Sequence, residues 1–101
     1  MVVDELSDRD VGDVFHALAD ATRRGILDDI SRGPSTVAEL AASRPITLAA
    51  VLQHIQVLEK AGLATTSKVG RSRTCHIDRG GLELAEGWIA DRRRSRVEQL
   101  D

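Results

Sequence analysis

The sequence predicts a mainly helical α+β fold in the order α-α-α-α-β-β-α. Three observations carry this prediction. Apolar residues recur at helical spacing through residues 10–61, a run rich in Thr, Val and Ile surrounds a glycine over residues 63–77, and helical spacing returns over residues 79–97. With 101 residues, 42% of them hydrophobic, the chain has the size of one domain with one core, residues 1–101.

Two helices are expected before residue 35. The first covers residues 10–19, where apolar residues stand at i, i+3, i+4 and i+7. These residues are Val11, Val14, Phe15 and Leu18. Asp20 is the predicted N-cap of the second helix, whose buried face holds Ile26, Leu27 and Ile30 and which ends at Arg32-Gly33-Pro34.

Residues 36–61 predict two further helices joined by a tight turn. Thr36 and Glu39 have the spacing of a capping box, which opens a short third helix. Thr47 is the predicted N-cap of a fourth helix that runs to Ala61 and stops at Gly62, because glycine readily adopts the left-handed conformation of a helix end. Two short helices in this arrangement form a helix-turn-helix.

A basic β-hairpin is expected directly after the fourth helix, over residues 63–77. Its strands are Leu63 to Val69 and Arg73 to Ile77, with Gly70 in the turn. The net charge of the chain is −2, but residues 68–79 hold four basic residues against one acidic residue. A helix-turn-helix followed by a basic hairpin predicts a winged helix, in which the hairpin (the wing) contacts phosphates or the minor groove.

The fourth helix presents a distinct outer face when Val51, Ile55 and Leu58 point inward. Ala49, Gln53, Gln56 and Lys60 then lie opposite, and Leu52 and His54 lie on the flanks. Glutamine matches the donor and acceptor pair of adenine in the major groove, and a small apolar residue suits a thymine methyl. For an isolated helix, ordinary solvated glutamines would explain this face equally well.

Asp78 is expected to cap the last helix, residues 79–97, whose apolar stripe holds Leu82, Ala85, Trp88 and Ile89. Arginines follow at Arg92–Arg94 and Arg96. Two interpretations of this cluster remain open: it extends a phosphate-binding surface, or it forms ion pairs with acidic residues of segment 4–13 in the same chain or a partner chain.

Four segments together resemble the ArsR/SmtB family of bacterial transcriptional repressors. They are "HALADATRRGIL" from His16, "TVAELA" from Thr36, "VLQHIQVLEKAGL" from Val51 and "KVGRSRTCHI" from Lys68. The resemblance implies a homodimeric repressor that binds an inverted-repeat operator in double-stranded DNA and leaves it when a signal binds. It also implies that the first and last helices form the dimer interface.

The resemblance and the helical pattern give two sets of candidate residues. Gln53 is the expected main base reader, and Thr47 and His54 are expected phosphate contacts. The DNA-binding set is Thr47, Leu48, Ala49, Gln53, His54, Gln56, Lys68, Arg71 and Arg73. The dimer-interface set is Val11, Val14, Phe15, Leu18, Leu82, Ala85, Trp88 and Ile89, although Trp88 also fits a plain core role.

The chain departs from the metal-sensing members of the family, because it lacks their paired cysteines and has no histidine after His76. We therefore expect no metal or other cofactor, and whether an inducer exists is left open. Cys75 has two interpretations. It is a thiol sensor whose pKa is lowered by Arg71 and Arg73, or it is a small residue on the inner face of a strand.

Other classes of function find little support. The sequence shows no nucleophile paired with a base and no phosphate-cradling glycine loop, so we expect no enzyme. Two aromatic residues are few for a single-strand binder, which stacks bases on aromatic rings. No apolar run approaches the ~18 residues of a membrane span, and we expect a cytoplasmic protein. The remaining alternative is a dimeric winged-helix module that binds proteins without specific DNA binding.

Overall fold

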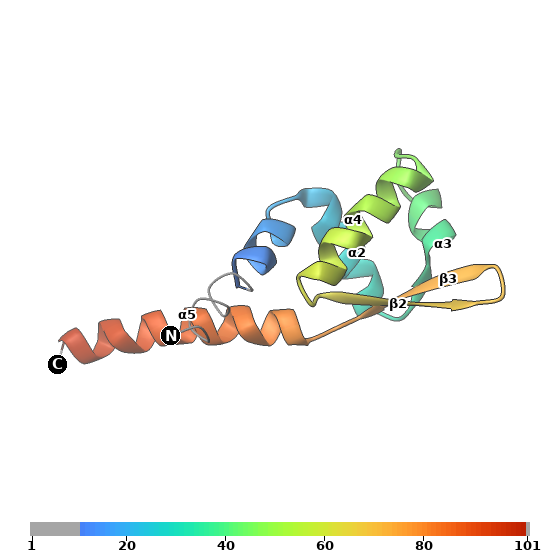
Figure 1. Ribbon diagram of the computed structural model, residues 1–101. Coiled ribbons are helices and arrows are strands. Elements are labelled where there is room, and N and C mark those ends of the chain that lie inside the picture. The colour runs from blue at the N-terminus through green and yellow to red at the C-terminus, as the bar shows by residue number, and fades with distance from the viewer. Residues whose placement is uncertain (1–10, 101) are drawn as a thin grey trace.

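The computed structural model describes the backbone of residues 11–100 and the side chains up to residue 94, and it has the predicted helix and strand order with one added strand (Figure 1). Residues 11–18 are helical. The elements that follow are α2 (Ala21–Ser31), β1 (Ser35–Thr36), α3 (Val37–Ala42), α4 (Leu48–Lys60), β2 (Ala64–Val69), β3 (Ser72–Ile77) and α5 (Gly80–Leu100).

The core is built by the inward faces of α2, α3 and α4 together with the hairpin. Ile26, Ile30, Leu40, Ile55, Leu58 and Leu63 are its largest fully buried hydrophobic side chains. The inward face predicted for the fourth helix is confirmed, since Val51, Ile55 and Leu58 are all at most 1% exposed. The helix-turn-helix is thus held rigidly by its apolar side, which leaves the opposite side of α4 free.

Side-chain caps fix where the helices begin. Thr36 Oγ1 accepts a hydrogen bond from the Glu39 N–H at 3.1 Å, and Glu39 Oε1 accepts one from the Thr36 N–H at 2.8 Å, which completes the predicted capping box. Asp20 and Thr47 cap α2 and α4 in the same way, by accepting from Arg23 N–H and Ala50 N–H. These three of the four predicted caps are confirmed.

The C-terminus of α4 ends in a Schellman motif at Gly62, whose φ is +71°. The Leu63 N–H donates to the Leu58 carbonyl at 2.9 Å, and the Gly62 N–H donates to the Glu59 carbonyl at 3.0 Å. This motif turns the chain directly from α4 into β2, so the wing starts at a fixed angle to the helix.

The sheet has three antiparallel strands in the order β1-β3-β2, where the sequence predicted two. The added strand is Ser35–Thr36, in which Ser35 pairs with Cys75. A strand of two residues is too short to show the alternation by which strands are predicted. At the other end of β3, Val69 pairs with Ser72 across a two-residue turn, and Gly70 has φ +62° at the first central position, as in a type II′ turn.

Helix α5 and the β2–β3 hairpin extend away from the helical core in opposite directions (Figure 1). The start of α5 lies against the end of α4, where the Gly81 N–H donates to the Gly62 carbonyl at 2.8 Å. Asp78 does not cap the helix in the usual way, but its Oδ1 accepts from the Gly80 N–H at 3.0 Å. Among the described residues, no helix is long and apolar enough to cross a membrane.

Candidate nucleic-acid interface

The outer face of α4 is exposed as the helical pattern predicted. Ala49, Gln53, Gln56 and Lys60 are all exposed, and Leu52 and His54 on the flanks are partly buried. None of these four exposed residues makes a side-chain hydrogen bond or ion pair to another described residue. Their side chains are therefore free to meet an external partner.

The beginning of α4 is also exposed, and its one polar group, the Thr47 hydroxyl, serves as the helix cap through its oxygen and keeps its O–H proton available to donate. Thr47 Oγ1 accepts the Ala50 N–H at 3.1 Å as the helix cap. Leu48 next to it is a large apolar side chain with 51% of its surface exposed. The beginning of the helix therefore presents mainly apolar groups to solvent.

His54 lies beside α2 and is not grouped with the wing. Its Nδ1 is 3.4 Å from Arg23 Nη1 and 4.0 Å from Asp20 Oδ2, and its side chain is 24% exposed. The Arg23 backbone N–H hydrogen bond, supported by the positive charge of the Arg23 side chain, holds the pKa of Asp20 below its ordinary value. Instead of pointing freely outward as a phosphate contact would, His54 joins α4 to the start of α2.

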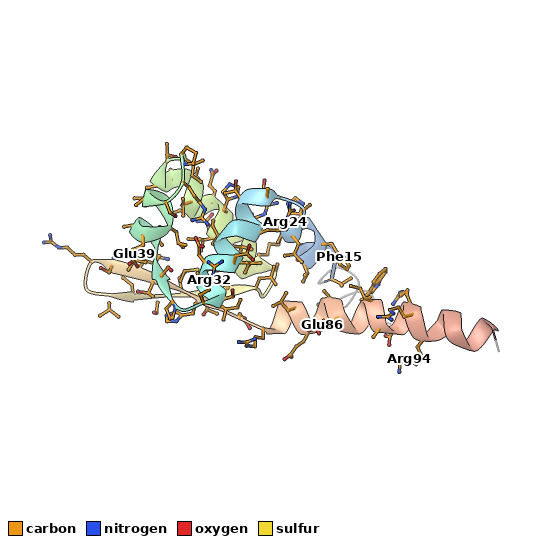
Figure 2. All side chains as sticks on the ribbon, turned by 180° about the vertical axis from the view of Figure 1, so that it is seen from behind. Phe15, Arg24, Arg32, Glu39, Glu86 and Arg94 are labelled. Atoms are coloured by element: carbon orange, nitrogen blue, oxygen red, sulfur yellow. The ribbon has the colours of Figure 1, made fainter. Side chains whose placement is uncertain are left out.

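Arg23 extends this connection to the first helical segment. Its Nε donates to the Ala17 carbonyl at 2.8 Å, and its Nη2 donates to the His16 carbonyl at 3.0 Å. Arg24, labelled in Figure 2, donates to the Leu18 carbonyl at 2.8 Å. Both arginines thus satisfy carbonyls at the C-terminal end of segment 11–18. The sequence interpretation missed this role, for which two arginines shortly after a helix end are the available signal.

The predicted wing residues Lys68, Arg71 and Arg73 are exposed and lie beside the beginning of α4. They share a cavity of about 300 Å³, which we call the wing groove. Its lining residues are Thr36, Val37, Ala38, Leu48, Leu52, Lys68, Arg71, Ser72 and Arg73. The structure thus brings Leu48 together with all three predicted basic wing residues, whereas Gln53, His54 and Gln56 lie outside the groove.

Two further contacts hold the interface in place, and the sequence interpretation missed both. Arg44, in the turn before α4, forms an ion pair with Asp29 of α2 at 2.7 Å and donates to the Leu40 carbonyl at 2.9 Å. On the other side, Thr66 Oγ1 of β2 donates to Glu59 Oε2 of α4 at 3.0 Å. The Arg44 bonds fix the turn before α4 relative to α2 and α3, and the Thr66 bond fixes α4 relative to the wing.

Cys75 does not have the environment expected of a thiol sensor. It lies on the inner face of β3 with 0% exposure. Burial, and next the negative charge of Glu59, raise the pKa of the Cys75 thiol to about 11. The prediction that Arg71 and Arg73 lower its pKa is therefore wrong, because both arginines lie near the solvent-exposed tip of the hairpin. The alternative interpretation, a small buried residue, describes the site.

The predicted dimer-interface residues divide into three groups by their exposure. Val11, Val14 and Ala85 are at most 6% exposed, so they pack inside their own chain and are not offered to a partner. By contrast, Phe15, Trp88 and Ile89 are 38%, 36% and 45% exposed. The rings of Phe15 and Trp88 meet edge to face with centroids 5.6 Å apart, and Figure 2 shows Phe15 on the side of segment 11–18 that faces α5. We call these three exposed residues the aromatic patch; Leu18 and Leu82 are partly buried beside the core.

Two arginines of α5, Arg92 and Arg94, have partners within their own helix. The Arg92 guanidinium lies 4.2 Å from the centroid of the Trp88 ring, and Arg94 pairs with Asp91 at 2.6 Å. Residues 4–10 and the Arg96 side chain lie outside the described part, so the predicted pairing with the acidic segment stays a prediction. No group of His, Cys, Asp or Glu residues in the described part could hold a metal ion.

Comparison with known proteins agrees with this geometry. A helix-turn-helix domain family model matches residues 18–67. The chain is 41% identical over 68 residues to the HTH-type transcriptional regulator Rv2034 of Mycobacterium tuberculosis, covering 67% of this chain and 64% of that relative. It is 39% identical over 84 residues to the uncharacterized HTH-type transcriptional regulator YuzN of Bacillus subtilis, covering 75% of this chain and 91% of that relative.

Solved structures extend the agreement to the whole fold. A crystal structure of an ArsR family transcriptional regulator, RHA00566, superimposes with a TM-score of 0.82 at 40% identity, covering 86% of this chain and 90% of that chain. The solution structure of a homodimeric winged helix-turn-helix DNA-binding domain from Mycobacterium bovis has the same fold, with a TM-score of 0.67 at 23% identity, covering 90% of this chain and 82% of that chain. The chain therefore belongs to the ArsR family of helix-turn-helix transcriptional regulators.

Proposed function

We propose that this protein is a homodimeric repressor that binds an inverted repeat in double-stranded DNA. One observation supports the proposal more than any other. The wing groove combines the exposed beginning of α4 with Lys68, Arg71 and Arg73. A helix that enters the major groove and a basic hairpin that contacts the adjacent backbone need to be neighbours in this way.

Within this proposal the residues of α4 and the wing have separate roles. Gln53 and Gln56 stand on the exposed face and read base edges, with Gln53 paired to adenine. Lys68, Arg71 and Arg73 neutralise phosphates, so they supply affinity that depends on salt and little on sequence. His54, held against Asp20 and Arg23, sets the position of α4 on the core.

The aromatic patch supports the dimer. Phe15, Trp88 and Ile89 are large apolar side chains left exposed on neighbouring elements, an arrangement typical of an interaction surface. The related M. bovis domain is homodimeric. A two-fold dimer places two copies of α4 on two half-sites, spaced by about one helical turn of DNA (~34 Å) or a small multiple. Repression follows when such a dimer occupies DNA that the transcription machinery needs.

The proposal is tested by selection from genomic DNA. The purified protein is incubated with sheared DNA of its source organism at ~150 mM salt, where non-specific phosphate binding is weakened, and the retained fragments are sequenced. The proposal predicts enrichment of one or a few inverted repeats that overlap promoters. Variant Arg71→Ala/Arg73→Ala is the matched control and should lose the enrichment.

The main alternative is a protein-interaction module with the same fold. Absence of enrichment by a sample verified to be folded and dimeric would contradict the repressor proposal and favour that module. Loss of transcription in cells that lack the protein, from genes next to an enriched repeat, would contradict the repressor role and indicate an activator.

A further inference from the structure

The first turn of α4 offers DNA bases an almost wholly apolar surface. Leu48, Ala49 and Ala50 have no polar side-chain atoms, and the Thr47 hydroxyl is engaged by the Ala50 N–H at 3.1 Å. The first side chain of α4 with a hydrogen-bonding group is Gln53, more than one turn later. The N-terminal end of α4 therefore has few side-chain groups that can form hydrogen bonds with base edges.

Leu48 is the dominant group on this surface. Leu48 has 51% of its surface exposed, whereas the tightly packed Val51 and Ile55 are 0% and 1% exposed. A dimer partner bound at the aromatic patch would not cover Leu48. Helix α5 and the hairpin extend from opposite sides of the core, and Leu48 lies beside the hairpin (Figure 1).

The walls of the wing groove indicate what does cover Leu48. The wall on α4 is apolar, formed by Leu48 and Leu52, and the wall on the hairpin is basic, formed by Lys68, Arg71 and Arg73. Thr36, Val37, Ala38 and Ser72 complete the lining. A DNA strand matches both walls, since its phosphates are anionic and its major-groove edge carries one apolar group, the C5-methyl of thymine. A, G and unmodified C have no equivalent apolar group at that edge.

We infer that Leu48, supported by Ala49, reads the C5-methyl group of a pyrimidine in each half-site, and that the pyrimidine is thymine. The inference rests on the proposed function and adds the chemistry of the operator to it. The half-site then contains a thymine whose methyl group, and not its hydrogen-bonding edge, is required for tight binding.

Deoxyuridine provides the test, because it pairs like thymine and keeps the O4 acceptor but lacks the methyl. The probe is the duplex that this protein enriches from a random-sequence library, with each half-site thymine replaced in turn by deoxyuridine. Affinities are measured by fluorescence anisotropy for the unmodified protein, Leu48→Ala, Leu48→Met and Gln53→Ala. Circular dichroism melting verifies that each variant is folded.

At one thymine position, we expect deoxyuridine to weaken binding by the unmodified protein roughly fourfold per half-site, the value of one buried methyl-sized group. Leu48→Ala should bind the thymine and deoxyuridine duplexes equally, because the apolar partner of the methyl is gone. Leu48→Met should keep the preference for thymine. Gln53→Ala should weaken binding to both duplexes by the same factor, which makes it the matched control.

Two results would overturn the inference while leaving the proposed function intact. One is an enriched duplex that binds equally well when any of its thymines is replaced. The other is a thymine preference that Leu48→Ala retains in full. In a further experiment, half-site cytosines are replaced by 5-methylcytosine. If this replacement changes the affinity and the deoxyuridine replacements do not, the methyl group that Leu48 reads belongs to 5-methylcytosine and not to thymine. If no duplex is enriched at all, the proposed function itself fails.

Discussion

Replacing Gly81 with alanine should destabilise the protein by about 2 kcal/mol. A Cβ at this position would lie 2.4 Å from the Ala61 carbonyl oxygen and 2.9 Å from the Gly62 carbonyl oxygen, both backbone atoms that cannot rotate away. Relief requires the start of α5 to move away from the end of α4, which weakens the 2.8 Å hydrogen bond from Gly81 N–H to the Gly62 carbonyl.

The expected loss of stability combines two destabilising effects and one stabilising effect. Overpacking of this kind costs about 1–3 kcal/mol. A weakened hydrogen bond adds about 1 kcal/mol. The higher helix propensity of alanine offsets up to about 1 kcal/mol of this.

Gly87→Ala on the same helix is the matched control, because its Cβ would meet nothing within 4 Å. It should stabilise the protein by up to about 1 kcal/mol through helix propensity. Far-UV circular dichroism melting at equal protein concentration measures both variants and the unmodified protein. Gly81→Ala should melt roughly 8–16 °C below the unmodified protein. If the two variants melt within a degree of each other, the close approach of α4 and α5 does not exist as described.

Three further perturbations test other parts of the structure. Arg71→Ala/Arg73→Ala should flatten the dependence of log affinity on log salt by about one unit for each phosphate that the wing no longer neutralises, and an unchanged slope in a titration of the enriched duplex would remove the wing from the interface. Ile89→Glu should make the protein monomeric in size-exclusion chromatography with light scattering. Val69→Glu, at a position on the wing that is 75% exposed, should leave a dimer. If both variants are dimers, the aromatic patch is not the interface. Because burial raises the pKa of Cys75 from its ordinary value of 9.0 to about 11, the folded state holds the thiol proton more tightly, so its contribution to stability is complete below about pH 9 and is lost as pH rises to about 11. Urea unfolding of the protein and of Cys75→Ala at pH 8 and pH 10.5 checks this, and an equal fall in stability for both would contradict it.

The sequence predicted well those features that local chemistry determines. Caps at Asp20, Thr36 and Thr47 require only a side-chain oxygen three residues before a backbone N–H, and such spacing is visible in the sequence. The inward face of α4 follows from helical periodicity in the same way. Gly62 and Gly70 were recognised as a helix end and a turn because positive φ favours glycine.

The features that were missed depend on contacts between distant parts of the chain. Strand β1 forms because Ser35 pairs with Cys75, and a two-residue segment contains no pattern from which that pairing could be predicted. Of the two interpretations of Cys75, the thiol sensor required a lowered pKa and is wrong, because closeness in sequence to Arg71 and Arg73 does not reveal burial beside Glu59. The sequence places His54 on a flank of the helix as a phosphate contact, since helical periodicity does not show that Arg23 stands next to it.

The candidate site shows the same division. The outer face of α4 could be assigned residue by residue from periodicity, but the groove between Leu48 and the wing could not. That groove depends on the angle at which β2 leaves α4 after the Schellman motif at Gly62, and on Thr66 hydrogen-bonding to Glu59. Tertiary geometry, and not composition, therefore explains why an apolar helix start and a basic hairpin meet.

Operator recognition by α4 is tested by comparing two affinities at ~150 mM salt. One is for the enriched inverted repeat, and the other is for a duplex of the same length and composition in which both half-sites are scrambled. A specific repressor predicts at least about 10³-fold tighter binding to the intact repeat, with an intermediate value when one half-site is scrambled. Equal affinity for all three duplexes would show that the protein binds DNA only through phosphate contacts, which would contradict operator recognition by α4.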